Sequence, residues 1–356
     1  MKITKRQLQL LKEATQLIGV SGQEKEVRNY LQKHFEEKKL PLLFDELGSI
    51  YAYKKGTDSS LKVMISGHMD EVGFITQEIL SNGLIKVVPI GGVDERSMIA
   101  HRAILKNSLG KLFYGAVTAN APHLNAEAAN FIKQITFDFG FRNKKEAEKA
   151  NIKFGDQIIL DGPFQILNKK KRLLAKAFDN RYSIALIIDL LDELENVTLP
   201  FDLYLGANVQ EEVGLRGATT ASNLIKPDLA IVLDCSPARD TFVSKEEEGV
   251  LGEGVLIRYL DRAMIGFPKL LKWQEEACKE TKVKYQYFHS TGGTDAGAIH
   301  KSQTGVLTLT HCICARGLHS PSTIIDVDDY LAAKKVLLHL LKNLNYEKYL
   351  SLKNNI

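Results

Sequence analysis

Apolar residues recur at helical spacing along the first part of the chain and predict two amphipathic helices, at roughly 4–18 and 22–38. The segment 19–22, GVSG, interrupts the pattern between them. Ser21 is placed to cap the second helix, with Glu24 three residues on completing the capping pattern. Charged residues run through the first helix, which therefore lacks the continuous apolar stretch of a signal peptide.

The pattern then changes to short apolar runs that are typical of strands. A strand is expected at about 49–54, and the compact run LKVMIS at 61–66 predicts a buried strand followed by polar residues. From about 72 to 165, short β-like runs and many glycines dominate, with one helical pattern at 144–150. We interpret this stretch as a small β domain inserted into a larger one.

Beyond residue 172, strands and helices alternate, which predicts an α/β domain whose mixed sheet is covered by helices on both faces. The larger domain would then comprise residues 1–71 and 166–356, and the inserted domain residues 72–165. The helices of this part are expected at 182–194, 270–281 and 327–344, and its strands at 201–209, 229–233, 256–260 and 305–314.

Composition narrows the class of protein. The 356 residues are 44% hydrophobic and carry a net charge of only +4, which together with the lack of a basic stripe interleaved with aromatics argues against nucleic-acid binding. The longest apolar runs are too short to cross a membrane, so a membrane partner is not expected. The four cysteines fit neither a disulfide framework nor a CxxC zinc site, and we expect buried reduced thiols in a cytoplasmic protein; they are Cys235, Cys278, Cys312 and Cys314.

Side chains that bind metal ions stand at the ends of predicted strands or in the loops that follow. Two histidines, two aspartates and one glutamate would supply one bridging carboxylate and two further ligands for each of two divalent ions. A second glutamate would remain as general base, and an aspartate beside a ligand histidine could orient its ring. Ligands without thiolate suit zinc, cobalt or manganese. The candidates are His68, Asp70, Asp179, Glu211, Glu212, Asp234 and His319.

Each candidate also has a simpler interpretation. A single histidine after a strand is more often a core or surface residue, and Asp179 before a helical run could be an N-cap. The pair Glu211-Glu212 could be exposed charge, and spacing alone does not assign which glutamate would be the base.

Six segments, in the same order and nearly from end to end, resemble the tetrahedral, TET-type metallo-aminopeptidases. Among these the sequence is most similar to the glutamyl aminopeptidase group of lactic-acid bacteria and streptococci. The segment NVQEEVGLRGA is long and specific, and agreement of all six by chance is implausible. The segments are GHMDEVGF (67–74), KAFDNRYS (176–183), YLGANVQEEVGLRGA (204–218), VLDCSPARD (232–240), GGTDAGA (292–298) and CARGLHSP (314–321).

The resemblance implies a separate role for each candidate. It makes Glu211 the general base and Asp70 the orienting carboxylate. It implies hydrolysis of the N-terminal residue of peptides, an α/β catalytic domain with an inserted β-barrel-like dimerisation domain, and dimers that assemble into a hollow homododecamer. One metal ion would be held by His68, Asp179 and Asp234, and the other by Asp179, Glu212 and His319.

Substrate preference depends on residues around this set. Arg258 matches an arginine of the acidic-side-chain pocket in the glutamyl group, where it would pair with a substrate Glu or Asp. From the sequence alone it could equally be an exposed strand residue. Relatives usually carry tryptophan, lysine and tyrosine where this chain has Val93, Thr291 and Gly317. Loss of the lysine weakens the case for strict Glu preference, and loss of the tyrosine would widen the site.

Other functions share this scaffold. An N-acyl deacylase or a broad or leucine-type aminopeptidase would use the same metal centre. A non-catalytic assembly protein belongs to a different class, and the unaltered ligand set argues against it. Comparison of free and acetylated peptides would separate an aminopeptidase from a deacylase.

Overall fold

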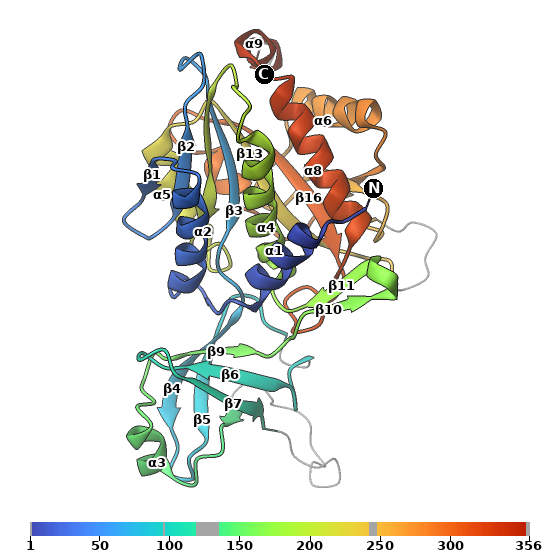
Figure 1. Cartoon of the computed structure of the whole chain (residues 1–356). Coiled ribbons are helices and arrows are strands. Elements are labelled where there is room, and N and C mark those ends of the chain that lie inside the picture. The colour runs from blue at the N-terminus through green and yellow to red at the C-terminus, as the bar shows by residue number, and fades with distance from the viewer. Residues whose placement is uncertain (1, 95–96, 119–134, 242–247, 354–356) are drawn as a thin grey trace.

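The computed structural model describes residues 2–94, 97–118, 135–241 and 248–353. It consists of a larger α/β unit and a smaller β unit below it in Figure 1, connected by the chain that leaves β3 and the chain that returns after β9.

The larger unit is built on an eight-stranded mixed sheet. Its central strands β12, β3, β13 and β16 run parallel, whereas β1, β2 and β12 pair antiparallel, as do β14 and β16. The strand order is β1 (Leu42–Phe44), β2 (Ile50–Lys54), β12 (Asp202–Asn208), β3 (Lys62–His68), β13 (Leu229–Pro237), β16 (Leu307–Ala315), β14 (Val255–Leu260) and β15 (Tyr285–His289).

Helices cover both faces of this sheet because successive strand residues point to opposite sides. In β3, Val63 and Ile65 belong to the large core under one set of helices, and Met64 belongs to the core on the opposite face. The prediction of a mixed sheet covered by helices is therefore confirmed. The first face carries α1 (Lys5–Gln16), α2 (Lys25–Glu37), α4 (Phe178–Leu194), α6 (Pro268–Thr281), α8 (Val327–Lys342) and α9 (Tyr346–Lys353), and the second carries α5 (Arg216–Ile225) and α7 (Ala296–Ile299).

The smaller unit is a closed antiparallel barrel of six strands, which confirms the barrel-like part of the expected fold. Phe74, Ile85, Phe137 and Ile158 fill its interior. Closure pairs each of these strands with a neighbour on both sides over at least part of its length. The strands, in barrel order, are β4 (Gly73–Ile79), β5 (Ile85–Ile90), β8 (Thr136–Asp138), β7 (Leu112–Val117), β6 (Arg102–Lys106) and β9 (Gln157–Leu160), with helix α3 (Lys144–Lys149) before β9.

A small antiparallel sheet lies where the chain returns to the larger unit. Its middle strand, β11, pairs with β10 on one side and with β17 on the other. Its segments are β10 (Gln165–Leu167), the short 3-10 turn η4 (Asn168–Lys170), β11 (Arg172–Ala175) and β17 (Thr323–Asp326).

Three local expectations are corrected by the structure. The strand expected to end at residue 233 continues to Pro237, so Asp234 lies inside β13 instead of after it. Helix α4 is assigned from Phe178, before the expected start at residue 182, but Asp179 and Asn180 have non-helical backbone angles, so its regular turns begin only after them. Ser21 does not cap the second helix, whose N-cap is Glu24 without a side-chain capping bond. The four cysteines are free and buried, in agreement with the expectation of reduced thiols.

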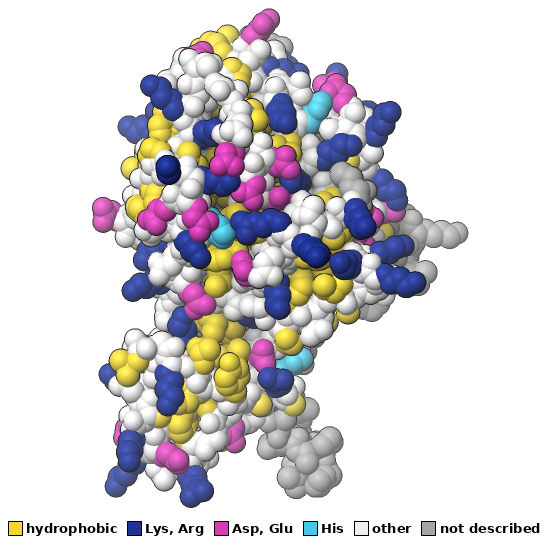
Figure 2. Space-filling model, viewed as in Figure 1, with side chains coloured by type: hydrophobic (Ala, Val, Ile, Leu, Met, Phe, Trp, Pro, Cys, Tyr) yellow, Lys and Arg dark blue, Asp and Glu magenta, His cyan; other side chains and the backbone are white. Residues whose placement is uncertain are grey.

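The surface shows both kinds of charge. In the face drawn in Figure 2, basic and acidic side chains both occur across the larger unit, and hydrophobic side chains are visible where the barrel joins it. Among the helices of the described ranges, none combines the length and apolar character needed to cross a membrane.

Candidate metal centre and active site

The candidate ligands gather at one edge of the central sheet, close to the barrel. Because β3, β12 and β13 run parallel, residues at their carboxyl ends lie at the same edge. Strand β3 ends at His68, β13 carries Asp234, and the glutamate pair follows β12. Two further candidates come from the first turn of α4 and from the loop between β16 and β17. The residues brought together are His68, Asp70, Asp179, Glu211, Glu212, Asp234 and His319.

Asp179 lies between the two histidines. Its Oδ1 is 3.2 Å from Nε2 of His68, and its Oδ2 is 3.4 Å from Nε2 of His319. Asp234 Oδ1 lies 3.7 Å from the same nitrogen of His68, and Glu212 Oε2 lies 3.4 Å from that of His319. Each histidine thus forms a three-residue group with two carboxylates, and Asp179 belongs to both groups, in each of which the ligand atoms lie within 4.8 Å of one another.

Glu211 lies against the same histidine as Asp234. Its Oε2 is 3.9 Å from Nε2 of His68, and it forms a third possible ligand group with His68 and Glu212. The side chain is buried. Geometry alone therefore places both glutamates at the centre without dividing the roles of base and ligand between them.

Asp70 connects the histidine to the glutamates. One of its carboxylate oxygens, Oδ1, lies 3.3 Å from Nδ1 of His68 and accepts a hydrogen bond of 3.0 Å from the backbone N–H of Glu211. The other accepts bonds from the backbone N–H of Glu212 at 3.1 Å and from the hydroxyl of Ser21 at 2.6 Å. Asp70 therefore orients the imidazole through its carboxylate and through its backbone carbonyl, which lies 3.2 Å from Nδ1 of His68, and its carboxylate also holds the backbone of the glutamate pair.

The loop between α1 and α2 supports the site through two residues. Besides the contact of Ser21 with Asp70, Oε1 of Glu24 accepts hydrogen bonds from the backbone N–H of Gln210 at 3.0 Å and of Gly22 at 2.7 Å. Ser21 and Glu24 were expected to form a helix cap, and the sequence did not reveal these contacts. No local pattern could have revealed them, because their partners follow strands that lie far along the chain.

Three residues next to the centre have left-handed backbone conformations that non-glycine residues rarely adopt. They are Ala177 at φ 54°, Gln210 at φ 57° and His319 itself at φ 58°. Such conformations cost about 1–3 kcal/mol each and persist where the surroundings impose them, often at functional sites. At His319 the ring is held by the carbonyl of Gly92, 2.8 Å from Nδ1.

Burial and mutual repulsion raise the pKa of several carboxyl groups. Burial, and then the charge of Asp179, raise the pKa of Glu212 to about 8. Burial also raises the pKa of Glu211 well above its ordinary value; His68 opposes this shift, and Asp234 adds to it. Burial raises the pKa of Asp234 as well. Burial is the largest cause of each shift, and repulsion from neighbouring carboxylates adds to it.

The pKa values of both imidazoles are raised as well, because nearby carboxylates favour the charged form of each ring. Burial disfavours the charged form of His319, but the hydrogen bond with Asp179 and the charge of Glu212 raise its pKa to about 10. Burial likewise opposes a charge on His68, while Glu211 and Asp179 raise its pKa well above its ordinary value. A divalent cation offsets such negative charge more effectively than a proton, and the oxygen and nitrogen donors match zinc, cobalt or manganese. The residues therefore fit a metal centre.

A buried ion cluster fixes the chain beside the centre. The three donors of the Lys176 ammonium are used by the carbonyl of Leu17 at 2.7 Å and by both oxygens of Glu71, at 2.9 and 2.8 Å. Burial lowers the pKa of Lys176 to about 8. Arg181, completely buried in α4, contacts the same carboxylate at 3.0 Å and the carbonyl of Met69 at 2.8 Å. This cluster ties the start of α4 to the segment that leaves β3.

Arg258 is only 3% exposed, so its interpretation as an exposed strand residue is wrong. Its Nε lies 3.0 Å from Oδ2 of Asp261, and its other nitrogens donate to the hydroxyl of Ser236 at 3.3 Å and the carbonyl of Gly292 at 3.0 Å. Ser236 follows Asp234 by two residues, and the guanidinium acts on the charge of that aspartate. Arg258 therefore lies on the Asp234 side of the cluster, with its own charge offset by Asp261.

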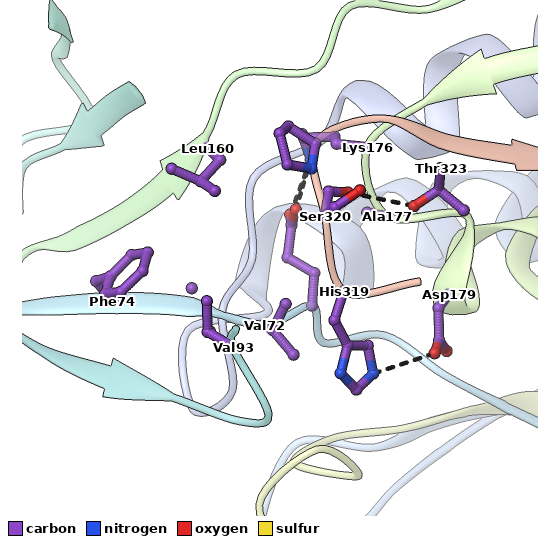
Figure 3. A pocket seen from close by; sticks show the side chains of 13 residues that line it. Val72, Phe74, Val93, Leu160, Lys176, Ala177, Asp179, His319, Ser320 and Thr323 are labelled. Carbon is purple, nitrogen blue, oxygen red and sulfur yellow. Dashed lines mark hydrogen bonds and ion pairs between the residues drawn. The ribbon is translucent and has the colours of Figure 1, made fainter. Parts of the chain in front are cut away.

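A pocket opens on the opposite side, next to His319 and Asp179 (Figure 3). The enclosed part of the pocket has a volume of about 30 Å³, and it opens into about 430 Å³ of space that includes solvent. Figure 3 shows apolar side chains gathered on one side of the ion pair between His319 and Asp179. These apolar residues are Val72, Phe74, Val93 and Leu160.

Known proteins are similar to this chain in sequence over nearly their whole lengths. The chain is 37% identical over 350 residues to the glutamyl aminopeptidase of Lactococcus lactis subsp. cremoris, covering 97% of this chain and 98% of that protein. It is 30% identical over 349 residues to the lysyl aminopeptidase of Pyrococcus furiosus, covering 95% of this chain and 98% of that protein.

Solved structures of other proteins have the same fold as this chain. A TET aminopeptidase from a marine-sediment Thaumarchaeota archaeon superposes with a TM-score of 0.93 at 28% identity, covering 98% of this chain and all (100%) of that chain. The TET1 peptidase of Pyrococcus horikoshii, which can assemble into a tetrahedron or a large octahedral shell, shares the fold with a TM-score of 0.85 at 24% identity, covering 95% and 100%. The sequence profile of the M42 glutamyl aminopeptidase family matches residues 48–336. The chain therefore belongs to the M42 glutamyl aminopeptidase family and is a hydrolase of the aminopeptidase type.

Proposed function

We propose that this protein is a two-metal aminopeptidase in which Glu211 is the general base. The observation that carries the proposal is the position of Asp179, whose two carboxylate oxygens face the two histidines. One divalent ion would be held by His68, Asp179 and Asp234, and the other by Asp179, Glu212 and His319. Zinc or cobalt suits this donor set best, with manganese as a third candidate.

Divalent ions held at these positions would polarise the scissile carbonyl and lower the pKa of water. The protein's own side chains contribute to the reaction by moving a proton. Glu211 accepts a proton from the attacking water on its carboxylate and returns it to the leaving amine. Asp70 keeps that carboxylate in place through the backbone N–H of Glu211 and orients His68 from the other side.

A preference for N-terminal Glu or Asp is the finer part of the proposal. Its support is the buried guanidinium of Arg258 on the Asp234 side and the similarity to a glutamyl aminopeptidase. Two of its five N–H donors form hydrogen bonds, to Ser236 and Gly292, and the Nε–H forms none although it lies 3.0 Å from Asp261, so donors remain for a substrate carboxylate. Hydrogen bonds to a charged group contribute about 1.5–3 kcal/mol, which corresponds to a preference of roughly 10- to 100-fold. Because Asp261 offsets the charge of Arg258, we expect the lower end of that range.

Reconstitution tests both parts. The metal-free protein is loaded separately with zinc, cobalt or manganese and offered Glu-, Asp-, Leu- and Lys-p-nitroanilide, together with one peptide in free and N-acetylated form. Release from free substrates alone supports an aminopeptidase, whereas faster cleavage of the acetylated peptide would assign a deacylase. A preference for Leu over Glu, or an unchanged Glu preference in Arg258→Met, would refute the role of Arg258.

We further propose that residues 72–165, which contain the barrel, mediate dimerisation and that dimers build a homododecamer around residues 1–71 and 166–356. Support comes from the shared fold with TET peptidases, one of which assembles into a tetrahedron. Mass determination in solution tests this: twelve copies of a 39.8 kDa chain are expected, and a monomer at micromolar concentration would contradict it.

A further inference from the structure

The pocket beside His319 is walled by apolar side chains from both units. Phe74 comes from β4 and Leu160 from β9 of the barrel, Val93 follows β5, and Pro321 follows the histidine in the larger unit. Val93 also packs partly against the barrel core, which supports its position in the wall. A pocket with this lining favours an apolar ligand group.

The charged groups that line the pocket already have partners. Lys176 uses its three donors on Leu17 and Glu71, and Glu71 also contacts Arg181. Asp179 is paired with both histidines. A charged ligand group would therefore have to displace an existing buried contact, whereas an apolar group would not.

Two glycines directly before Val93 lie against the proposed metal ligands. The carbonyl of Gly92 lies 2.8 Å from Nδ1 of His319. A Cβ on Gly92 would lie 3.2 Å from that nitrogen, and one on Gly91 would lie 2.8 Å from Cγ1 of Val72 and 3.2 Å from Cβ of Glu212. A side chain at Gly92 would crowd His319, and Gly91 in addition has a positive φ of 78° that favours glycine.

The pocket and Arg258 lie on different sides of the cluster. In the proposed function the N-terminal side chain of the substrate lies by Arg258, near Asp234. A peptide that crosses the centre from there reaches the His319 side with its next residue. We infer that this pocket binds an apolar side chain at the second position of the substrate, directly after the scissile bond. The inference rests on the proposed function and adds a second determinant of specificity.

Peptides Glu-X-Ala-Ala with X as Gly, Leu or Lys test the inference on the metal-loaded enzyme, by measurement of released glutamate. Burial of a leucine side chain predicts a kcat/KM for Leu roughly 10- to 100-fold above that for Gly. Val93→Thr keeps the size of the side chain but adds a hydroxyl, and should reduce the Leu/Gly ratio about fivefold or more. Val93→Asp should in addition favour Lys over Leu, a gain that misfolding cannot produce.

Val88→Thr is the matched control, because this valine is 42% exposed on strand β5 of the same barrel and does not line the pocket. It should keep the Leu/Gly ratio of the unaltered enzyme. A ratio below about three in the unaltered enzyme, or a ratio that Val93→Thr leaves unchanged, overturns the inference while the proposed function stands. If none of the peptides is cleaved with any of the three metals, the proposed function fails first and the inference fails with it.

Discussion

Replacement of Asp70 by asparagine tests whether one carboxylate organises the whole site. Asp70 is completely buried and accepts hydrogen bonds from the N–H groups of Glu211 and Glu212 and from the hydroxyl of Ser21, besides its contact with His68. An asparagine keeps one acceptor oxygen and presents an NH₂ group at the other position. In either orientation that NH₂ group faces a backbone N–H donor.

The expected loss has two parts. A buried N–H left without an acceptor costs about 1–3 kcal/mol, and here that N–H belongs to the backbone that positions the proposed base. Removal of a carboxylate that orients a ligand histidine typically costs about 10- to 100-fold in metal affinity or activity. Together these effects predict that Asp70→Asn lowers kcat by about 10²- to 10⁴-fold.

The assay is steady-state kinetics on a peptide that the unaltered enzyme cleaves, with elemental analysis of bound metal in parallel. Ser21→Ala removes one of the bonds to Asp70 without affecting His68, and should lower kcat about tenfold. Ser21→Thr keeps the hydroxyl and should restore turnover. An Asp70→Asn variant with full metal and a kcat within threefold of that of the unaltered enzyme would exclude this organising role of Asp70.

Three further predictions follow from the site and the core. Glu211→Gln should bind metal nearly normally while kcat falls about 10²- to 10⁴-fold, and near-normal turnover would exclude it as the base. Asp179→Ala should lose at least one bound ion, so full metal occupancy by elemental analysis would contradict the bridging role. His311 is buried and neutral, with Nδ1 3.0 Å from Nε2 of Gln274 and Nε2 2.8 Å from the carbonyl of Ala333; burial lowers its pKa from 6.5 to about 4. The unfolded chain takes up this proton first, so stability is lost as the pH falls from about 6.5 to about 4, by about 2 kcal/mol at pH 5. Urea unfolding of the metal-free protein at pH 7.5 and pH 5 should show a smaller pH effect in His311→Gln, and an equal effect would count against this assignment.

Much of the larger unit could be predicted from local pattern. The run at 61–66 is the core of β3, because alternate residues such as Val63 and Met64 bury on opposite faces of the sheet. The predicted ends of strands and helices were less accurate where polar ligands interrupt an element. Asp234 seemed to end its strand, yet the backbone ladder with β16 continues to Pro237 because hydrogen bonds between strands do not depend on side-chain polarity.

The inserted barrel was predicted only as a set of short strands. The order of the strands in the barrel could not be predicted from the sequence, because β4 and β6 both pair with β9 across large separations in sequence. Such short strands leave the pairing open until the interior, with Phe74 and Phe137 in contact, selects one arrangement.

The sequence by itself determined the kinds of ligand and their order along the chain, and the resemblance assigned a role to each. Only the tertiary structure decided which atoms meet: Asp179 between His68 and His319, Ser21 on Asp70 instead of on a helix end, and Asp261 beside Arg258. The physical reason is the separation along the chain over which each effect acts. Hydrophobic periodicity acts between neighbours in sequence, whereas the charge, burial and hydrogen bonding of a site are set by side chains that the fold brings together from distant segments.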